Sequence, residues 1–405
     1  MKKFKAIVLG AGYRGRAYAE YAAIHPEQLE IVGVADPVQA ETIPAPRYWS
    51  DWRKCLEERP DADIVIISMP DDLHFEPAMM ALDAGYHLLL EKPISPTEEQ
   101  CREIIAKALW KKKLVFVGHV LRFSPSYARI KALINSGEMG EVVSITHQES
   151  AGFFKMAHSY VRGIFNNCAK SSPIILAKCS HDFDLFSWWL GGRKCCKVMS
   201  IGSLKHFTKK SRPRGATERC CTCPERIEKN CVWSAKKMYL ESTDLHYLFA
   251  NPTRVAMLDV VNNSRFGRCV YCCDNDVPDH QAVLMEFEGG VTVSHMMTGF
   301  TNRNMRTTRI SCTKGEIFFD GAELHVNLFS GDTAKTEVPK ELRGGNYSRH
   351  GGGDLNLVAA FLRALENGDE QQYAEINRVS LQSHVISFAA ERSRMAGGVQ
   401  VELCD

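Results

Sequence analysis

The chain begins with a glycine-rich turn whose spacing suits the binding of phosphate groups. An apolar run, Lys5 to Leu9, leads into Gly10-Ala11-Gly12-Tyr13-Arg14-Gly15, and a helix-compatible segment, Arg16 to Ile24, follows. The first glycine permits the tight turn, the second lets the backbone approach a pyrophosphate, and the third lets the helix pack closely on the strand. The helix N-terminus offers N–H groups and a positive dipole end to the phosphates. The alternative is an α/β domain whose glycines only form a turn.

An acidic residue follows the next apolar run. The run Glu30 to Ala35 ends on Asp36, 21 residues after Gly15. A carboxylate at this place can accept hydrogen bonds from the adenosine ribose hydroxyls. Pro37-Val38-Gln39-Ala40 contains no Lys or Arg to meet a 2′-phosphate, and the nearest downstream cation is Arg47. The order strand, glycine turn, helix, strand and acid therefore predicts a dinucleotide site that prefers NAD to NADP.

A lysine stands at the end of a later apolar run. Glu91-Lys92-Pro93 directly follows His87 to Leu90, which is predicted to be a strand. In the expected fold this places Lys92 beside the nicotinamide, where its ammonium could polarise a substrate hydroxyl or exchange a proton with it. The alternative for an isolated lysine is a solvated surface position.

The elements that must position these residues alternate between strand and helix. The predicted strands are Asp63–Ser68, His87–Leu90 and Leu114–Val117, and the predicted helices are Leu73–Ala84 and Thr97–Lys111. This alternation predicts a doubly wound parallel sheet that binds ligands at the carboxyl ends of its strands. Those ends carry the glycine turn, Ser68-Met69-Pro70, Glu91-Lys92-Pro93 and Gly118-His119.

The pattern changes after Arg122. A predicted helix, Ser126–Asn135, leads into alternating strands, and two helices close the chain; the strands are Val142–Glu149, Ala282–Glu288, Val291–Gly299 and Thr308–Cys312, and the closing helices are Leu355–Glu366 and Asn377–Ala396. Gly289-Gly290 is predicted to form a hairpin. We therefore expect an N-terminal Rossmann domain over residues 1–122 and an α+β domain with an open, mainly antiparallel sheet over 123–405. Residues 202–280 are rich in Cys, Arg and Asn and are predicted to be an insertion.

Composition excludes several kinds of partner. The 405 residues carry a formal charge of +2, from 50 basic and 48 acidic residues, so we expect no nucleic-acid partner. No apolar run approaches the roughly 20 residues that span a bilayer, so we expect no membrane contact. The four apolar residues Ala6 to Leu9 are better explained as the first strand than as part of a signal peptide. A cytoplasmic homo-oligomer is the expected state.

The chain has 15 cysteines. In a large nucleotide-binding protein this count indicates reduced thiols, and several cysteines, such as Cys179 and Cys312, are expected in the core. Within the insertion, Cys220, Cys223 and Cys231 form a C-x₂-C-P-x₆-C pattern, with Cys269, Cys272 and Cys273 further on. Thiolates at this spacing can share a structural zinc ion, whereas reduced core cysteines are the competing interpretation.

Taken together, the motifs resemble those of the Gfo/Idh/MocA oxidoreductases. GAGYRG, MPDDLH (Met69 to His74), EKP, GHVLRFSP (Gly118 to Pro125) and SHDFDLFSWWLGG (Ser180 to Gly192) occur in that family's order. The resemblance implies a Rossmann domain joined to an open-sheet domain, with NAD(P) between them and a sugar or cyclitol as substrate. It also implies that Lys92 and His181 are catalytic and that Asp184 matches the family aspartate three residues after the histidine.

The chain departs from the family pattern before His181. The family aspartate four residues earlier is replaced by Ala177, which Lys178 follows. Lys178 could supply a second cation to the substrate, or Asp182 could replace the lost acid. The cofactor set is then Gly10, Gly12, Tyr13, Arg14, Gly15, Asp36, Ser68, Met69, Pro70, His74, Glu91, Lys92, His119 and Arg122, and the catalytic set is Lys92, His181 and Lys178.

Polar clusters elsewhere suit a polyhydroxylated ligand, which needs many hydrogen bonds to replace its water. His158, Tyr160, Arg162 and His280 are expected to meet the substrate together with Asp182. Exposed polar loops are the alternative. The sequence thus predicts an NAD-dependent oxidoreductase acting on a secondary alcohol of a sugar, glycoside or cyclitol. The rival hypothesis is an NAD-containing enzyme that cleaves glycosides by oxidation, elimination and re-reduction. A non-enzymatic NAD-binding protein is the third.

Overall fold

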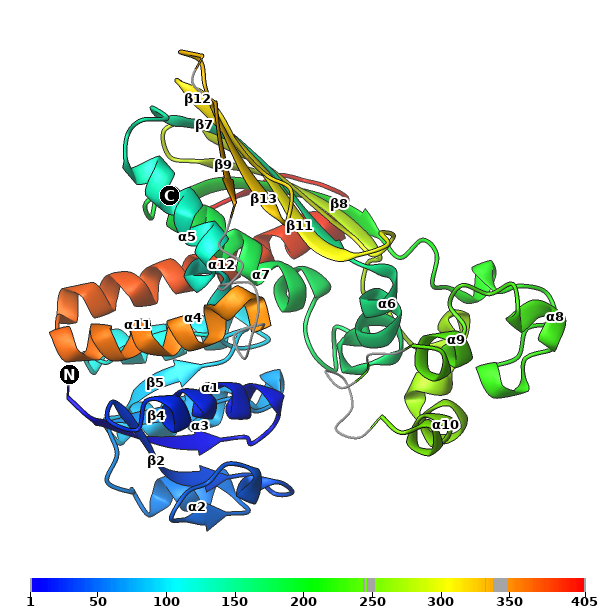
Figure 1. Ribbon diagram of the computed structural model, residues 1–405, viewed down its shortest axis with the longest axis horizontal. Coiled ribbons are helices and arrows are strands. Elements are labelled where there is room, and N and C mark those ends of the chain that lie inside the picture. The colour runs from blue at the N-terminus through cyan, green and yellow to red at the C-terminus, as the bar shows by residue number, and fades with distance from the viewer. Residues whose placement is uncertain (1, 243–244, 246–251, 332, 338–348, 404–405) are drawn as a thin grey trace.

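The computed structural model describes the chain except residues 1, 243–244, 246–251, 332, 338–348 and 404–405, and it contains two sheets (Figure 1). Sheet A is parallel, with the strand order β3-β2-β1-β4-β5-β6. Its strands are β1 (Phe4–Leu9), β2 (Leu29–Ala35), β3 (Tyr48–Trp49), β4 (Ile64–Ile67), β5 (His87–Leu90) and β6 (Val115–Val117), and its helices are α1 (Tyr13–Ile24), α2 (Trp52–Glu57), α3 (Phe75–Asp83) and α4 (Glu98–Trp110).

The apolar runs form sheet A because they are buried on both faces. Every residue of β4 is buried, as expected of a central parallel strand covered by helices. Thr97 begins α4 as predicted: its hydroxyl accepts a hydrogen bond from the backbone N–H of Gln100. β3 and α2 were not predicted, because two and six residues are too few to show a period.

Sheet B has the order β14-β13-β12-β11-β7-β10-β9-β8-β15. β7 and β10 run parallel, and the other neighbours are antiparallel. Its strands are β7 (Val142–Ala151), β8 (Cys195–Ser203), β9 (His280–Phe287), β10 (Val291–Thr298), β11 (Asn304–Cys312), β12 (Gly315–Phe319), β13 (Glu323–Leu328), β14 (Thr333–Glu337) and β15 (Val401–Glu402). The predicted fold class, a Rossmann sheet followed by a mainly antiparallel sheet, is confirmed.

The predicted hairpin lies between β9 and β10. Gly289 and Gly290 form its turn with φ of +83° and +77°, values that favour glycine. The sequence did not indicate β8 or β12 to β14. β8 begins with two cysteines and ends with small polar residues, so its alternation is weak.

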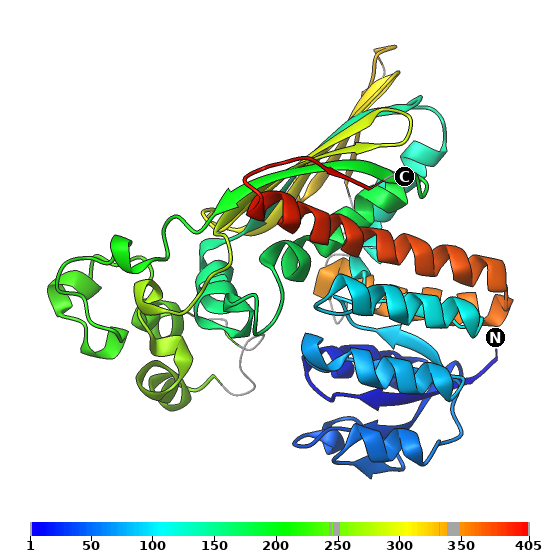
Figure 2. The same cartoon turned by 180° about the vertical axis from the view of Figure 1, so that it is seen from behind.

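Helices cover the inner face of sheet B, and the C-terminal helices reach both sheets. α5 (Pro125–Asn135), α6 (Phe153–Lys155) and α7 (Ile174–Trp189) precede β8, while α11 (Gly353–Asn367) and α12 (Glu370–Met395) follow β14. Leu357 and Phe361 of α11 join the core formed by β1 and α1. α12 contacts α4, α7 and β8, and it runs along both sheets in Figure 2. The division at residues 122 and 123 stays a prediction.

The segment between β8 and β9 forms a lobe beyond the end of sheet B, next to α6 (Figure 1). It contains the short helices α8 (Glu225–Glu228), α9 (Ala235–Leu240) and α10 (Arg254–Asn263). Among the residues described, none of the helices combines the length and apolarity needed to cross a bilayer.

Candidate active site

The glycine turn lies between β1 and α1 at the carboxyl edge of sheet A. Gly10 has φ of +93°, and a Cβ there would lie 2.8 Å from the Ser68 carbonyl oxygen. A Cβ on Gly15 would lie 2.0 Å from the carbonyl oxygen of Gly10, whereas a Cβ on Gly12 would meet only the Gln39 side chain, at 3.9 Å. The fold itself therefore requires the first and third glycines. The second leaves open space where a pyrophosphate fits.

Asp36 holds this turn together. Its Oδ2 accepts a hydrogen bond from the N–H of Ala11 at 2.8 Å, and its Oδ1 accepts from the N–H groups of Val38 and Gln39 at 2.9 and 2.8 Å. Partial burial opposes ionisation, but these three donors keep the pKa of Asp36 below its usual value. The carboxylate is ionised and partly exposed, as an acceptor for ribose hydroxyls must be.

Two further loops at this edge are tied together by His74. Its Nδ1 lies 2.8 Å from the carbonyl oxygen of Pro93 and its Nε2 lies 3.0 Å from that of Met69. Ser68 donates its hydroxyl to the Gly10 carbonyl at 2.7 Å. These assigned cofactor residues thus hold the loops around the glycine turn, and Tyr13 beside them is 40% exposed.

Arg14 and Glu91 pair with each other. The Arg14 guanidinium contacts Glu91 Oε1 at 2.5 Å and Asp354 Oδ1 at 2.6 Å. Glu91 Oε2 accepts the backbone N–H of Lys92 at 2.9 Å. Burial opposes ionisation of Glu91, but Arg14 and Lys92 hold its pKa below the usual value. The pair fixes the backbone on which Lys92 stands.

The Lys92 ammonium reaches across to α7. Its Nζ donates to the carbonyl oxygen of Ala177 at 2.8 Å. Burial lowers the pKa of Lys92, and the charges of Asp71 and Glu91 oppose that effect. Burial raises the pKa of Asp71, whose Oδ2 is buried and accepts no hydrogen bond from the described residues. Lys92 is therefore a desolvated ammonium held at the junction of the two sheets.

His181 is buried on α7, four residues after Ala177 and therefore on the same helix face. Its ring lies 6.0 Å from that of His119 and 6.3 Å from that of His350, centroid to centroid. Burial, reinforced by the charge of Lys92, lowers the pKa of His181 well below its usual value. Its imidazole is neutral near pH 7 and can accept a proton, and its Nδ1 makes no hydrogen bond with the described residues.

Asp184 anchors the loop after β6 to α7. Its carboxylate pairs with both Nε and Nη2 of Arg122 and lies 2.8 Å from Nδ1 of His119. Burial opposes ionisation, but Arg122 and His119 bring the pKa of Asp184 down to about 2. His119 and Arg122, which the sequence assigned to the cofactor, are held by this carboxylate.

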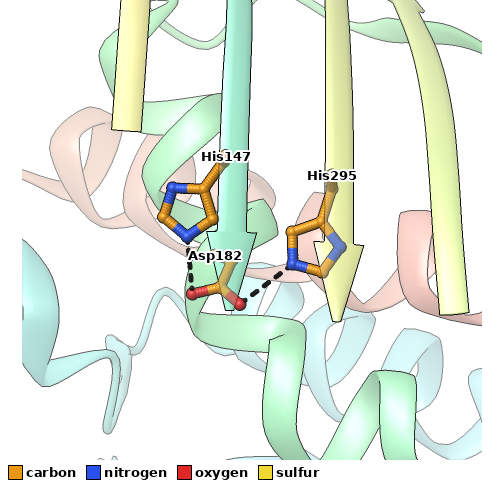
Figure 3. A group of neighbouring side chains, drawn as sticks. All are labelled: His147, Asp182 and His295. Carbon is orange, nitrogen blue, oxygen red and sulfur yellow. Dashed lines mark hydrogen bonds and ion pairs between the residues drawn. The ribbon is translucent and has the colours of Figure 1, made fainter. Parts of the chain in front are cut away.

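A network of buried charges lies between α7 and the inner face of sheet B. Asp182 points between His147 of β7 and His295 of β10 (Figure 3). His295 Nε2 lies 3.2 Å from Asp182 Oδ2, and His147 Nε2 lies 3.4 Å from Oδ1. Arg306 of β11 donates its Nε to Oδ1 at 2.6 Å. Although these two imidazoles and the carboxylate are close enough to share a metal ion, Arg306 already supplies a positive charge to Asp182.

The same network continues to the lysine beside the site. Arg306 Nη2 lies 2.5 Å from Glu149 Oε2, and Lys178 Nζ lies 3.0 Å from Glu149 Oε1. Glu149 is completely buried. Lys178 is thus held at the end of a chain of paired charges that starts at Asp182.

Family models match both halves of this architecture. One, described as "Oxidoreductase family, NAD-binding Rossmann fold", matches residues 4–119, and another, described as "Oxidoreductase family, C-terminal alpha/beta domain", matches residues 131–235. The chain belongs to the Gfo/Idh/MocA oxidoreductase family. The resemblance drawn from the motifs is confirmed.

Named relatives and solved structures extend this match. The chain is 33% identical over 211 residues to a 2,7-anhydro-N-acetylneuraminate hydratase of Mediterraneibacter gnavus. The aligned residues make up 51% of this chain and 54% of the relative. A levoglucosan dehydrogenase in complex with NADH and L-sorbose has a TM-score of 0.70 at 19% identity, with 100% of both chains covered. The scyllo-inositol dehydrogenase of Lactobacillus casei has a TM-score of 0.66 at 18% identity, with 99% of both covered. The chain spans about half the length of the curated relatives it matches.

The polar residues assigned to the substrate lie in different surroundings within this Gfo/Idh/MocA chain. His158 Nδ1 lies at hydrogen-bond distance, 3.0 Å, from the Tyr239 hydroxyl oxygen, and the His158 ring stacks on that of Phe266. Arg162 donates to the carbonyl oxygens of Arg268 and Trp233, at 2.7 and 2.6 Å. These two residues thus hold the lobe against the π-helical turn Met156–Arg162.

The other residues predicted to meet the substrate are buried or paired with a neighbouring residue. Tyr160 is buried, and burial raises its pKa well above the usual value. His280 lies 2.8 Å from Asp279 at the start of β9. Asp182 is fully buried against sheet B, so it acts on a ligand only through its neighbours. All these roles stay predictions.

The cysteines of the lobe gather without forming a tight cluster. The backbone N–H of Cys269 donates to the Glu218 carbonyl at 2.8 Å, which brings that segment beside Cys220. Cys220 Sγ accepts the N–H of Ala235 at 3.3 Å. In the part of the chain that the structure describes, no three thiols bring their sulfurs within 4.8 Å of one another. The present arrangement of Cys220, Cys223 and Cys231 therefore does not fit a shared zinc ion.

Several site residues were missed because no local pattern marks them. Asp71 lies within the MPDDLH motif but was not singled out as a site residue, and the charge of Lys92 acts on it. His350 pairs with Asp354 at 3.0 Å, and Asp354 in turn pairs with Arg14. Glu149 and Arg306 stand on strands more than 150 residues apart, so only the sheet brings them together.

Proposed function

We propose that this chain is an NAD-dependent oxidoreductase that transfers a hydride between nicotinamide and a secondary alcohol of a sugar, glycoside or cyclitol. The observation that carries this proposal is the convergence of Lys92 and His181. Lys92 Nζ binds the carbonyl of Ala177, one helical turn before His181, beside a glycine turn shaped for a dinucleotide. The positive charge of Lys92 helps to lower the pKa of His181.

The side chains divide the chemistry between them. When bound, NAD⁺ supplies the hydride acceptor. The neutral imidazole of His181 accepts the hydroxyl proton as the C–H bond breaks and its electron pair leaves with the hydride. The Lys92 ammonium donates a hydrogen bond to the same oxygen and stabilises the negative charge that develops there. A carbonyl forms at the oxidised carbon.

The substrate class follows from the relatives. The compounds named for these relatives include levoglucosan, L-sorbose and scyllo-inositol, which are neutral and polyhydroxylated, and an anhydro-neuraminate, which is a sugar acid. We therefore propose a polyhydroxylated small molecule for this chain. Screening such compounds with NAD and following the absorbance of reduced cofactor tests the proposal, and a panel that yields no reduced cofactor contradicts it.

A redox-neutral cleavage or hydration is the second candidate. It is favoured by the hydratase among the relatives and by Lys178, a cation near the site that could stabilise an enolate. Oxidation of one carbon acidifies its neighbour, elimination expels the leaving group, and the hydride returns. Incubation with aryl glycosides in deuterated water distinguishes the two. Aglycone release and solvent exchange without net reduced cofactor would favour this second candidate.

A homo-oligomer is proposed from the outer face of sheet B. Met199, Ile201, Leu284, Met296 and Met305 are exposed there, on four adjacent or near-adjacent strands. Exposed apolar residues gathered on one face are typical of an association surface. Light scattering should give more than one chain per particle for the native protein, and Leu284→Lys should reduce the particle to one chain.

Structural zinc and a cytoplasmic location stay predictions. Binding zinc at Cys220, Cys223 and Cys231 would need the lobe to draw these thiols together. Elemental analysis of protein purified without added metal tests this directly. About one zinc per chain, lost in Cys223→Ser, would support the hypothesis, whereas metal-free protein of full stability would favour reduced core cysteines.

A further inference from the structure

Three lysines reach the candidate active site from separate elements. Lys92 follows β5, Lys155 ends α6, and Lys178 stands on α7. The positive charges of Lys178 and Lys92 both act on Lys155, and the charge of Lys178 also acts on Lys92. Because like charges repel one another, the gathering of three lysines at this site needs an explanation.

The position of Lys155 is fixed by a tight turn after β7. Gly152 has φ of +65°, and a Cβ there would lie 2.8 Å from the backbone nitrogen of Asn304. The next residue, Phe153, donates its N–H to the Thr301 carbonyl at 2.8 Å. Asn304 also accepts a hydrogen bond from Lys178 Nζ at 3.3 Å. The turn therefore directs α6, and Lys155 with it, toward the end of sheet B where Lys178 lies.

The three ammonium groups differ in their partners. Lys178 pairs with Glu149 at 3.0 Å, and Lys92 donates to the Ala177 carbonyl at 2.8 Å. Among the described residues, no ion pair or hydrogen bond involves the Lys155 ammonium, and the residue is half-buried. Burial, reinforced by the other two lysines, lowers its pKa to about 8. Its nitrogen is not among the buried polar atoms, so Lys155 is a cation that a ligand entering the site can reach.

The nearby carboxylates do not balance this charge. Glu149 is shared by Lys178 and Arg306, and Asp182 is committed to Arg306 and the two histidines of sheet B. Asp71 is left to face Lys92, and burial raises its pKa, which favours its neutral form. Glu91 is paired with Arg14, so no carboxylate of the described residues forms an ion pair with Lys155.

We propose that the substrate carries a carboxylate, which Lys155 and Lys178 bind while the hydroxyl to be oxidised faces Lys92 and His181. A carboxylate on the substrate supplies the partner that Lys155 lacks among the described residues. The inference rests on the proposed oxidoreductase function and narrows its substrate class to sugar acids. Uronic, aldonic and related polyhydroxy acids have this chemistry.

Matched pairs of ligands test the proposal by binding. The NAD-loaded protein is titrated by calorimetry with glucose and glucuronate, galactose and galacturonate, and glucose 6-phosphate. We expect at least one acid to bind ten times or more tightly than its neutral partner. Equal binding of acid and neutral sugar in every pair would overturn the proposal, as would tighter binding of the phosphate than of both acids.

Variants locate the anion site. Lys155→Met should weaken binding of the preferred acid at least tenfold more than binding of its neutral partner, and Lys155→Arg should restore most of the preference. Lys112→Met, which removes an exposed lysine paired with Glu370, is the matched control and should leave both affinities unchanged. An acid preference that survives in Lys155→Met would overturn the assignment.

Activity separates this inference from the function on which it rests. Preferential binding of an acid with no reduced cofactor from any ligand would contradict the oxidoreductase proposal and leave the anion site standing. Reduced cofactor formed from neutral polyols, without any preference for acids, would support the oxidoreductase proposal and contradict the anion site.

Discussion

The glycine turn and the interface between α7 and sheet B show two ways of building a functional site. The turn is local: Gly10, Gly12 and Gly15 lie within six residues, and Asp36 closes it with three backbone hydrogen bonds. The interface is not local, because Asp182 meets His147, His295 and Arg306 from three different strands. The first can be recognised in a sequence, whereas the second exists only after the sheet has formed.

The two regions also differ in what holds them. Steric fit decides the turn, since a Cβ at Gly10 or Gly15 would collide with backbone. Charge pairing decides the interface, where four ionisable side chains surround two buried carboxylates; the four are His147, His295, Arg306 and Lys178. We therefore expect substitutions in the turn to act on cofactor binding and substitutions in the interface to act first on stability.

Removing Asp182 should produce the largest loss of stability. In Asp182→Ala, Arg306 loses one of its two buried partners and both histidines lose their acceptor, so we expect the free energy of unfolding to fall by about 3–5 kcal/mol. Chemical denaturation measures the change. Asp61→Ala, at an exposed ion pair with Lys5, is the control and should change stability far less, because solvent screens that pair. A loss no larger than the control's would show that the network contributes little.

Two alanine substitutions test the steric account of the turn. Gly15→Ala places a Cβ against the Gly10 carbonyl and should cost about 1–3 kcal/mol of stability as well as NAD affinity. Gly12→Ala meets no backbone atom, so it should leave the melting temperature near the native value and still weaken NAD binding at least tenfold. Equal effects of the two variants on stability would contradict the different roles assigned to these glycines.

Asp184 should make stability depend on pH in a defined range. Its pKa of about 2 in the folded chain lies below the value near 3.9 of an unfolded aspartate. Its contribution, about 2–3 kcal/mol, is therefore complete above about pH 4 and is lost as the pH falls toward 2. The difference in unfolding free energy between native protein and Asp184→Asn should shrink over that range. A constant difference would show that folding does not lower the pKa of Asp184.

Asp36 should have the smallest effect. Asp36→Ala removes an acceptor for the ribose and for the Ala11 N–H, so we expect NAD binding to weaken by about 1–2 kcal/mol. The native protein should bind NADP markedly less well than NAD because the carboxylate repels a 2′-phosphate. Titrations that give equal affinity for the two cofactors would remove Asp36 from this role.

The extent of sequence-based prediction follows the same division. The strands and helices of sheet A, apart from β3 and α2, could be predicted because buried runs such as Ile64-Val65-Ile66-Ile67 and caps such as Thr97 are local features. Lys92 could be placed because it directly follows a strand. β8 and the charged network could not, because weak alternation and pairings across more than 100 residues leave no short pattern. Lys155 was missed for the same reason: only the turn at Gly152 directs it to the site.

The central claim is that Lys92 and His181 carry out the proton chemistry and do not retain the cofactor. Its most direct test measures turnover and NAD affinity together, in the native protein and in Lys92→Met and His181→Gln, with the polyol that the screen identifies. We expect turnover to fall on the order of 10²-fold or more in each variant while the Kd for NAD changes by less than about threefold. Native turnover in either variant, or a loss of NAD affinity that parallels the loss of turnover, would contradict the claim.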